Sequence, residues 1–253
     1  MTPAETAVTP RKNSDVRNRM AIALDVDDLV EAARIAREVR PWFGVAKVGL
    51  ELFSAAGPDA VLELVDTGYR VFLDLKLHDI PTTVRRTAQV IAAIDASYVT
   101  MHAAGGRAML RAGVEGLAHG AAGAGVVTPV ALAVTVLTSD DDVPPHVLGK
   151  RVKAALDAGC AGIVCASSDV REAKQLAPRL VTVVPGIRPA GASRHDQARA
   201  STPQAALAAG ADVLVIGRAV TAAADRAKAA SELVGSLALE RRQRPEDAAV
   251  TPR

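Results

Sequence analysis

Aromatic side chains are scarce in this sequence: Phe, Trp and Tyr together make up 2% of the 253 residues. Proteins that bind single-stranded nucleic acid commonly stack the bases on aromatic side chains, so this composition argues against that class. Hydrophobic residues nevertheless account for 49% of the chain, and the core must therefore consist of Ala, Val, Leu and Ile. Aliphatic runs of this kind are typical of parallel strands that are buried on both faces.

Cysteine is also rare, and the chain contains only Cys160 and Cys165. Two cysteines provide no disulfide framework, and four intervening residues without a nearby histidine pair make a poor metal site. We therefore expect both cysteines to be small buried residues in or beside a strand.

Long apolar segments and an excess of one charge are missing as well. No run approaches the roughly 20 residues that span a bilayer, and the polar residues 1–19 lack the apolar centre of a signal peptide. We expect a cytoplasmic protein with no membrane partner. Because 30 Lys and Arg stand against 28 Asp and Glu, the sequence lacks the charge footprint of a nucleic-acid-binding protein.

Short aliphatic runs alternate with Ala-rich stretches of helical spacing between residues 19 and 238. The predicted strands are 20–25, 45–49, 70–75, 98–102, 130–137, 162–166, 181–184 and 213–216. The predicted helices are 29–40, 58–67, 82–94, 107–119, 146–158, 170–176, 203–209 and 219–237. This order predicts an α/β fold, a single-domain (β/α)8 TIM barrel over 19–238. Residues 1–18 and 239–253 are polar and are expected to be disordered tails.

Charged residues stand at the C-terminal ends of several predicted strands, the end at which TIM barrels carry their active sites. They are Asp25, Lys47, Asp74, Lys76 and His102. Side chains alternate along a strand, so Asp74 and Lys76 are predicted to share one face and to offset each other's cost of burial. The active site is therefore expected at this face of the barrel.

Two further charges extend this pair. Lys47 enters the same barrel mouth from the neighbouring strand, and Asp79 follows Lys76 by three residues. We expect these four charges to alternate in sign and to keep both lysines protonated, so that a lysine here donates a proton and is no Schiff-base nucleophile. The alternative is a structural array of salt bridges that ties neighbouring strands together.

Two loops late in the chain are predicted to bind a phosphate. Gly217 and Arg218 follow a strand at the start of a helix, where backbone amides and a guanidinium can face an anion. The preceding unit contributes Pro185 and Arg188, and phosphate sites after strands seven and eight recur in TIM barrels. The alternative is that Gly186 and Gly217 are ordinary turn glycines.

Residues 190–198 form a polar segment that is long for a connection between a strand and a helix. We expect this segment to be a mobile lid, with Gln197 reaching oxygen atoms of the ligand when the lid closes. Phosphate binding far from the reacting atoms offsets the cost of closing such a lid.

The segment Asp74-x-Lys76-x-x-Asp79-Ile80-Pro81-x-Thr83 resembles the signature of the orotidine 5′-phosphate decarboxylase family. The Asp-x-Lys-x-x-Asp part is shared with related barrel enzymes that act on sugar phosphates, whereas the Ile-Pro-x-Thr continuation is specific. The resemblance extends over residues 20–237. Further matching segments follow in the family's order: Ala23-Leu24-Asp25, Lys47-Val48-Gly49, Val136-Leu137-Thr138-Ser139, Pro185-Gly186-Ile187-Arg188-Pro189, Asp196-Gln197 and Ile216-Gly217-Arg218.

The resemblance implies a catalytic group composed of Lys47, Asp74, Lys76 and Asp79. In this group Lys76 protonates the pyrimidine carbon that loses carbon dioxide, and Asp74 lies beside the substrate carboxylate. Asp79, together with Thr83, projects into the site of a second copy of the chain, so a homodimer is implied. No metal or organic cofactor is implied.

The resemblance also implies which residues bind the substrate. Asp25 and Lys47 bind the ribose hydroxyl groups, and Thr138 contacts the pyrimidine ring. The remaining implied contacts are with the phosphate or its surroundings: Pro185, Arg188, Gln197, Gly217 and Arg218.

Two other functions stay open on the sequence alone. One is a metal-dependent decarboxylase or aldolase of a sugar phosphate, which would hold a divalent metal on the same carboxylates. The other is a non-catalytic nucleotide-binding barrel, which the intact pair of Asp74 and Lys76 disfavours. The acidic residues 140–142 depart from the family pattern. His78 and His102 are expected to pack beside the mouth without a catalytic role.

Overall fold

The computed structural model describes residues 16–140, 142–189, 199 and 201–243, with side chains up to Leu237. The expected tails lie largely outside these residues. Residues 16–18 form a short helical turn, and the last helix continues to Gln243, past the expected domain end at residue 238. The expected lid at 190–198, including Gln197, lies outside the described residues.

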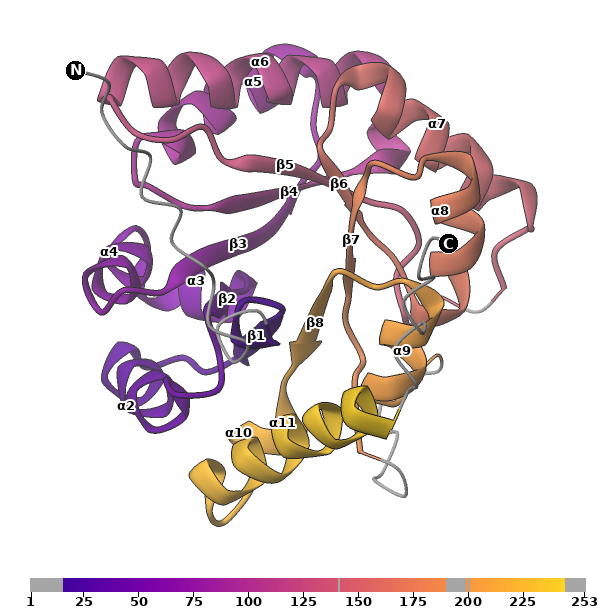
Figure 1. Cartoon of the computed structure of the whole chain (residues 1–253). Coiled ribbons are helices and arrows are strands. Elements are labelled where there is room, and N and C mark those ends of the chain that lie inside the picture. Colours follow the sequence, from indigo (N-terminus) through magenta and orange to yellow (C-terminus); the bar gives the residue numbers. More distant parts are fainter. Residues whose placement is uncertain (1–15, 141, 190–198, 200, 244–253) are drawn as a thin grey trace, which may run out of the picture.

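Eight parallel strands pair in sequence order and close into a barrel, which confirms the predicted fold (Figure 1). The strands are β1 Met20–Leu24, β2 Val45–Val48, β3 Arg70–Leu77, β4 Tyr98–His102, β5 Val130–Val134, β6 Gly162–Val164, β7 Val181–Val184 and β8 Val213–Ile216. Pairing of β1 with β8 closes the ring, with Met20 opposite Leu214.

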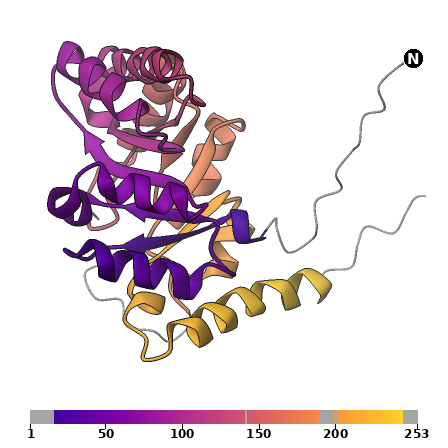
Figure 2. The ribbon, with the colours of Figure 1, turned by 90° about the vertical axis from the view of Figure 1, so that its left-hand side faces the viewer.

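Helices cover the outside of the barrel, and the last of them runs along its outer surface in the view of Figure 2. They are α2 Leu29–Val39, α3 Leu50–Ala56, α4 Asp59–Asp66, α5 Pro81–Ala92, α6 Gly106–Ala124, α7 His146–Ala158, α8 Val170–Leu176, α9 Pro203–Ala209, α10 Arg218–Thr221 and α11 Arg226–Gln243, with short 3-10 turns at Ala103–Gly105 and Ser167–Asp169. None of the helices in the described part of the chain is long and apolar enough to cross a membrane.

Beyond shifts of a few residues at element ends, three differences from the sequence prediction concern whole elements or the barrel mouth. Helix α3 was not predicted, because it buries only Leu52 and therefore shows no apolar stripe of helical period. The predicted last helix is divided into α10 and α11, and β5 ends at Val134 although the apolar run continues to Leu137. The residues after Val134 instead line the barrel mouth, which periodicity alone does not distinguish from a strand.

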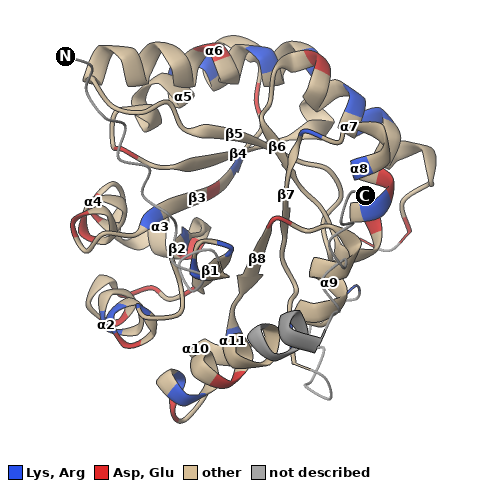
Figure 3. Ribbon diagram, viewed as in Figure 1, with Lys and Arg blue, Asp and Glu red and all other residues tan. Residues whose placement is uncertain are grey.

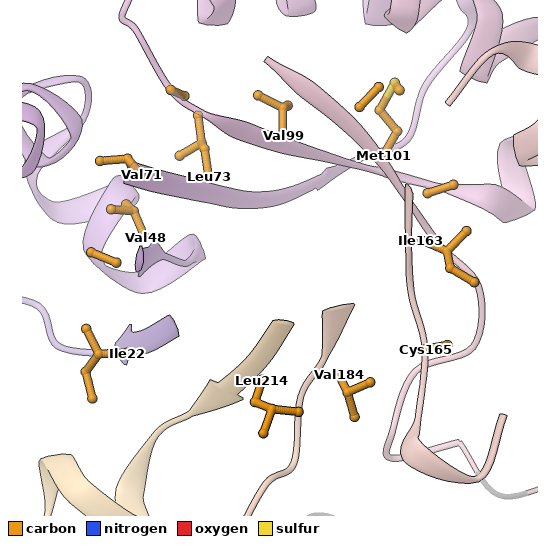
Figure 4. Close-up of a cluster of buried hydrophobic side chains, with 14 of the residues drawn as sticks. Ile22, Val48, Val71, Leu73, Val99, Met101, Ile163, Cys165, Val184 and Leu214 are labelled. Carbon is orange, nitrogen blue, oxygen red and sulfur yellow. The ribbon is translucent and has the colours of Figure 1, made fainter. Parts of the chain in front are cut away.

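Alternation along the strands divides the core into two layers. One face of each strand points outward against the helices, as Ile22, Val71 and Met101 do in Figure 4. The other face fills the barrel. This inner cluster consists of Ala21, Ala23, Val45, Phe72, Tyr98, Leu132, Val134, Val164, Val183, Val213 and Val215. The abundance of Val and Ala explains how a chain with so few aromatic residues fills a barrel.

The two cysteines are buried and unpaired, as predicted. Cys165 belongs to the outward-facing layer, and Cys160 lies in the same core two residues before β6. Burial raises the pKa of each thiol to about 12, so both remain protonated and unreactive at neutral pH.

Helices α5 and α6 approach each other closely at two glycines. A Cβ atom on Gly116 would lie 2.2 Å from the carbonyl oxygen of Arg85, and one on Gly120 would lie 2.0 Å from that of Gln89. Helix α5 is therefore held with little freedom. Its N-terminus, where Pro81 occupies the first turn, directly follows the segment that carries Asp74, Lys76 and Asp79.

Candidate active site

A cavity of about 460 Å³ opens at the C-terminal ends of the strands, within the usual size range of small-molecule sites. Nine of the proposed site residues line it: Asp25, Lys47, Asp74, Lys76, Thr138, Pro185, Arg188, Gly217 and Arg218. Figure 3 shows acidic and basic residues on β3, whereas the adjacent β4 and β5 carry neither kind. The charges of the barrel wall are thus concentrated on one side of the mouth.

Within one chain, four of the charges of the mouth form two ion pairs. Lys47 Nζ lies 2.7 Å from Asp25 Oδ1, and Lys76 Nζ lies 2.8 Å from Asp74 Oδ2. The expected alternating network is therefore divided, because among the ion pairs of the described residues none joins Lys47 to Asp74 or Lys76 to Asp79. Each lysine still has a carboxylate partner, as the sequence predicted.

Simple alternation does not explain how Lys76 reaches the cavity. Leu73 pairs with Val99 of β4 and Leu77 pairs with Met101, so the three residues 74–76 stand opposite a single residue of β4. This is a bulge, and Lys76 has a φ of 51°, which costs a residue with a side chain roughly 1–2 kcal/mol. Such backbone strain is often found at functional sites, where the surrounding structure holds it in place.

The residue opposite the bulge is Thr100, which the sequence analysis did not identify. It is fully buried, its hydroxyl lies 3.0 Å from Asp74 Oδ1, and it accepts the backbone N–H of Lys76 at 2.9 Å. The detectable signal was weak: a threonine between the apolar residues Val99 and Met101, two residues before His102 at the strand end.

Asp79 and Thr83 do not belong to this cavity. Both are exposed at the start of α5, and Asp79 Oδ1 accepts the backbone N–H of Ile80 at 2.6 Å. Ile80 itself is 67% exposed, a high value for a large aliphatic side chain. These residues form an outward-facing edge beside the mouth.

His78 and His102 lie beside the site, as expected, and their rings stack with centroids 5.4 Å apart. His102 Nδ1 accepts the backbone N–H of Ala104 at 3.1 Å and thereby caps the short turn that follows β4. Burial lowers the pKa of His102, and the nearby cations Arg151 and Lys76 lower it further. The imidazole is thus kept neutral and able to accept this hydrogen bond.

The opposite side of the cavity is formed by the loops after β7 and β8. Gly186, with a φ of 76°, lets the chain turn so that Pro185 and Arg188 both face the cavity. The Arg188 side chain is 9% exposed, and its Nε has no hydrogen-bond partner among the described residues. A buried guanidinium nitrogen without a partner is suited to an anionic ligand.

The site contains further residues that the sequence analysis missed. Glu51 of α3 and Thr221 of α10 line the same wall as Lys47 and Arg218. Glu51 lies on the unpredicted helix α3. Thr221 follows Arg218 by three residues, and this spacing places the two side chains on the same face of α10. The floor of the cavity is apolar and consists of Ala23, Phe72, Val134, Val164 and Val215.

A hydrogen bond from helix α7 fixes the start of the loop that carries Thr138. The guanidinium of Arg151 on α7 donates to the carbonyl oxygen of Thr135, where the chain leaves β5. Val136, Leu137 and Thr138 then line the cavity. Of the acidic stretch, residue 141 lies outside the described residues.

Potential metal ligands do not gather in the described part of the chain: no group of three or more His, Cys, Asp and Glu side chains is placed to hold an ion. Two of the carboxylates that line the mouth, Asp25 and Asp74, each face a lysine.

Comparison with known proteins places the chain in a family. Residues 18–233 match the model of the orotidine 5′-phosphate decarboxylase / HUMPS family. Orotidine 5′-phosphate decarboxylase of Anaeromyxobacter sp. (strain K) is 46% identical over 230 residues, which cover 87% of this chain and 98% of the relative. The enzyme of that name from Thermobifida fusca is 44% identical over 232 residues, covering 86% of this chain and 95% of the relative.

A solved structure supports the same assignment. The crystal structure of orotidine 5′-phosphate decarboxylase from Lactobacillus acidophilus superimposes with a TM-score of 0.72 at 33% identity and covers 85% of this chain and 96% of that one. The barrel, the cavity at the C-terminal ends of its strands and these similarities agree. The chain belongs to the orotidine 5′-phosphate decarboxylase / HUMPS family.

Proposed function

We propose that the chain decarboxylates orotidine 5′-phosphate to uridine 5′-phosphate, a step of de novo pyrimidine biosynthesis in the cytoplasm. The names of its relatives support this substrate. The observation that carries the proposal is the Lys76 ammonium group, which lies 2.8 Å from Asp74 in the wall of the cavity. An ammonium group in this position can transfer a proton to a bound substrate.

The chemistry requires a group that stabilises negative charge. The bond between the ring carbon and the carboxylate breaks, carbon dioxide leaves, and the electron pair remains on the ring carbon. An ammonium group fixed beside that carbon stabilises the developing carbanion and then transfers its proton to it. Lys76 is left neutral and regains a proton from solvent, so no organic cofactor is required.

The remaining residues of the cavity would hold the substrate. Asp25 and Lys47, already paired at 2.7 Å, are suited to the ribose hydroxyls because together they offer an acceptor and a donor. Thr138 faces the pyrimidine from the loop after β5. Arg188 and Arg218, with the backbone at Gly217, receive the phosphate at the opposite end, and Gln197 closes over it.

Asp79 and Thr83 are proposed to complete the site of a second copy of the chain. Their exposure at the start of α5, next to the exposed Ile80, supports this arrangement, because an aliphatic side chain there gains from being covered. The functional unit would then be a homodimer with two shared sites.

Turnover of orotidine 5′-phosphate by the purified chain tests the proposal, measured as the loss of substrate absorbance with and without exhaustive chelation. We expect full activity in both conditions. Activity that disappears with the chelator and returns with a divalent metal would favour the metal-dependent sugar-phosphate enzymes of the same barrel group. Binding of uridine 5′-phosphate without any turnover would indicate a non-catalytic nucleotide-binding barrel.

A further inference from the structure

Thr100 occupies the position on β4 that faces the bulge of β3. Its side chain is fully buried and points into the barrel, in line with Tyr98 on the same strand. The bulge places residues 74–76 opposite this single threonine. A bulge leaves backbone groups that the partner strand's ladder does not satisfy.

The hydroxyl of Thr100 compensates for this loss. Its Oγ1 accepts the backbone N–H of Lys76 at 2.9 Å, which is the residue with the left-handed backbone. A valine of the same shape would leave that half-buried N–H without this acceptor. Thr100 therefore stabilises the local backbone that directs the Lys76 side chain into the cavity.

The same hydroxyl also fixes Asp74. An ionised carboxylate only accepts hydrogen bonds, so the hydroxyl proton of Thr100 points toward Asp74 Oδ1 at 3.0 Å. The other carboxylate oxygen, Oδ2, is thereby turned toward Lys76 Nζ at 2.8 Å. One hydroxyl thus holds the backbone of the proton donor and the side chain of its carboxylate partner.

We propose that Thr100 is a positioning residue of the decarboxylation site, which sets the geometry of the pair formed by Asp74 and Lys76. This inference rests on the proposed function. It assigns Thr100 no contact with the substrate, because Thr100 lies behind the two charged residues and is absent from the cavity wall. Its effect should therefore appear in kcat more than in KM.

The decisive comparison is between Thr100→Val and Thr100→Ser, assayed with orotidine 5′-phosphate. Thr100→Val keeps the shape and removes the hydroxyl, and we expect kcat to fall about ten- to hundredfold because misplacement of a reacting group by about 1 Å has an effect of this size. KM should change little. Thr100→Ser restores the hydroxyl, and turnover should return close to that of the unchanged enzyme.

Thr182→Val provides a matched control. Thr182 is also a buried strand threonine whose hydroxyl contacts a carboxylate, Asp212 Oδ2 at 3.0 Å, and a backbone amide, that of Asp212 at 3.2 Å. It lies at the opposite, N-terminal end of the barrel, away from the cavity. We expect Thr182→Val to lower the melting temperature while leaving kcat unchanged.

Hydrogen exchange of the Lys76 amide tests the bond directly, and the amide should exchange faster in Thr100→Val than in the unchanged chain. Should the valine variant fail to fold, Thr100→Ala gives the same comparison with a smaller side chain. Equal kcat in the hydroxyl-free variant and the unchanged enzyme would overturn the inference, as would a serine variant as slow as the valine one. If the chain without any substitution showed no turnover, the proposed function would be refuted instead. The positioning role would still be tested by hydrogen exchange: a Lys76 amide that exchanges equally fast in Thr100→Val and in the unsubstituted chain would refute the hydrogen bond.

Discussion

The rings of His78 and His102 stack with an interplanar angle of 17°, and the second of them holds the turn after β4 through its unprotonated Nδ1. Burial, with the charges of Arg151 and Lys76, lowers the pKa of His102 from its ordinary value of 6.5. Protonation would both remove the acceptor for Ala104 and add a cation beside others. The neutral form of His102 is thus favoured.

This arrangement predicts a specific dependence of stability on pH. Because the pKa of His102 is lower in the folded protein, the unfolded chain takes up this proton first as the pH falls. Above pH 6.5 the contribution of His102 to the free energy of unfolding is complete. This contribution is lost as the pH falls from 6.5 toward the pKa of His102 in the folded protein, and below that pKa it changes no further. Urea unfolding between about pH 5 and 8 measures it.

The variant His102→Asn separates this residue from other titrating groups. An Asn side-chain oxygen can replace Nδ1 as the acceptor for Ala104 but does not titrate. We expect its free energy of unfolding to vary less over the same pH range than that of the unchanged chain. Identical pH profiles for the two proteins would show that another group is responsible.

Replacing the proposed proton donor should separate chemistry from binding. In Lys76→Ala we expect kcat to fall by at least about 10²–10⁴-fold, the usual contribution of a positioned general acid. Affinity for uridine 5′-phosphate, measured by calorimetry, should change far less because the phosphate contacts remain. Lys153→Ala removes an exposed lysine of α7 and serves as the control. Near-normal turnover of the Lys76 variant would contradict the proposed mechanism.

The sequence predicted the fold well because its patterns are local and repeated. Eight aliphatic runs each correspond to a strand of the barrel, and the charges at their ends, Asp25, Lys47 and Asp74, all line the cavity. Strand polarity alone was sufficient for this, since parallel strands bring all their C-terminal ends to one face.

Other features could not be predicted, since they depend on neighbouring strands. The bulge at Lys76 is a matter of register between β3 and β4, and no pattern within β3 reveals it. Thr100 has its role only because it lies opposite that bulge. Likewise, the pairing of Lys47 with Asp25 in place of Asp74 depends on side-chain reach between β2 and its two neighbours, β1 and β3.

A shared site in a dimer predicts that two inactive variants complement each other. Lys76→Ala lacks the proton donor of its own site, and Asp79→Asn lacks the residue that it contributes to its partner's site. In a mixed dimer, one of the two sites receives neither change and should be active. Mixing the purified variants under conditions of subunit exchange should therefore restore up to about one quarter of native activity for random pairing.

The control for complementation is each variant exchanged with itself, which should remain inactive. A mixture of two variants altered in the same residue, Lys76→Ala with Lys76→Met, should not recover either. Absence of recovery in the first mixture, when exchange is verified independently, would mean that Asp79 does not act in the site of the partner.

The Nε of buried Arg188 has no hydrogen-bond partner within the described part of the chain, which predicts a phosphate contact. In Arg188→Met we expect uridine 5′-phosphate to bind more weakly by about 1.5–3 kcal/mol, the usual contribution of a hydrogen bond to a charged group. Uridine lacks the phosphate, and its affinity should be unaffected. Arg179→Met removes an exposed arginine and controls for the change in net charge. Equal losses for both ligands would assign Arg188 to the structure of its loop and not to phosphate binding.

At the N-terminal end of the barrel, Asp212 Oδ2 accepts hydrogen bonds from Lys174 Nζ at 2.7 Å and from the Thr182 amide at 2.8 Å. Burial alone would raise its pKa, but these bonds outweigh burial and lower it. Asp212 therefore stabilises the fold at neutral pH and loses this effect as the pH falls through its folded pKa.

We expect Asp212→Asn to lower the free energy of unfolding by about 1–3 kcal/mol at neutral pH. Urea unfolding measures this, with the exposed Asp66→Asn as control. The turnover of folded Asp212→Asn should equal that of the unchanged chain, because the cavity is at the other end of the strands; a loss of kcat without a loss of stability would contradict this division of the barrel into a stabilising and a catalytic end.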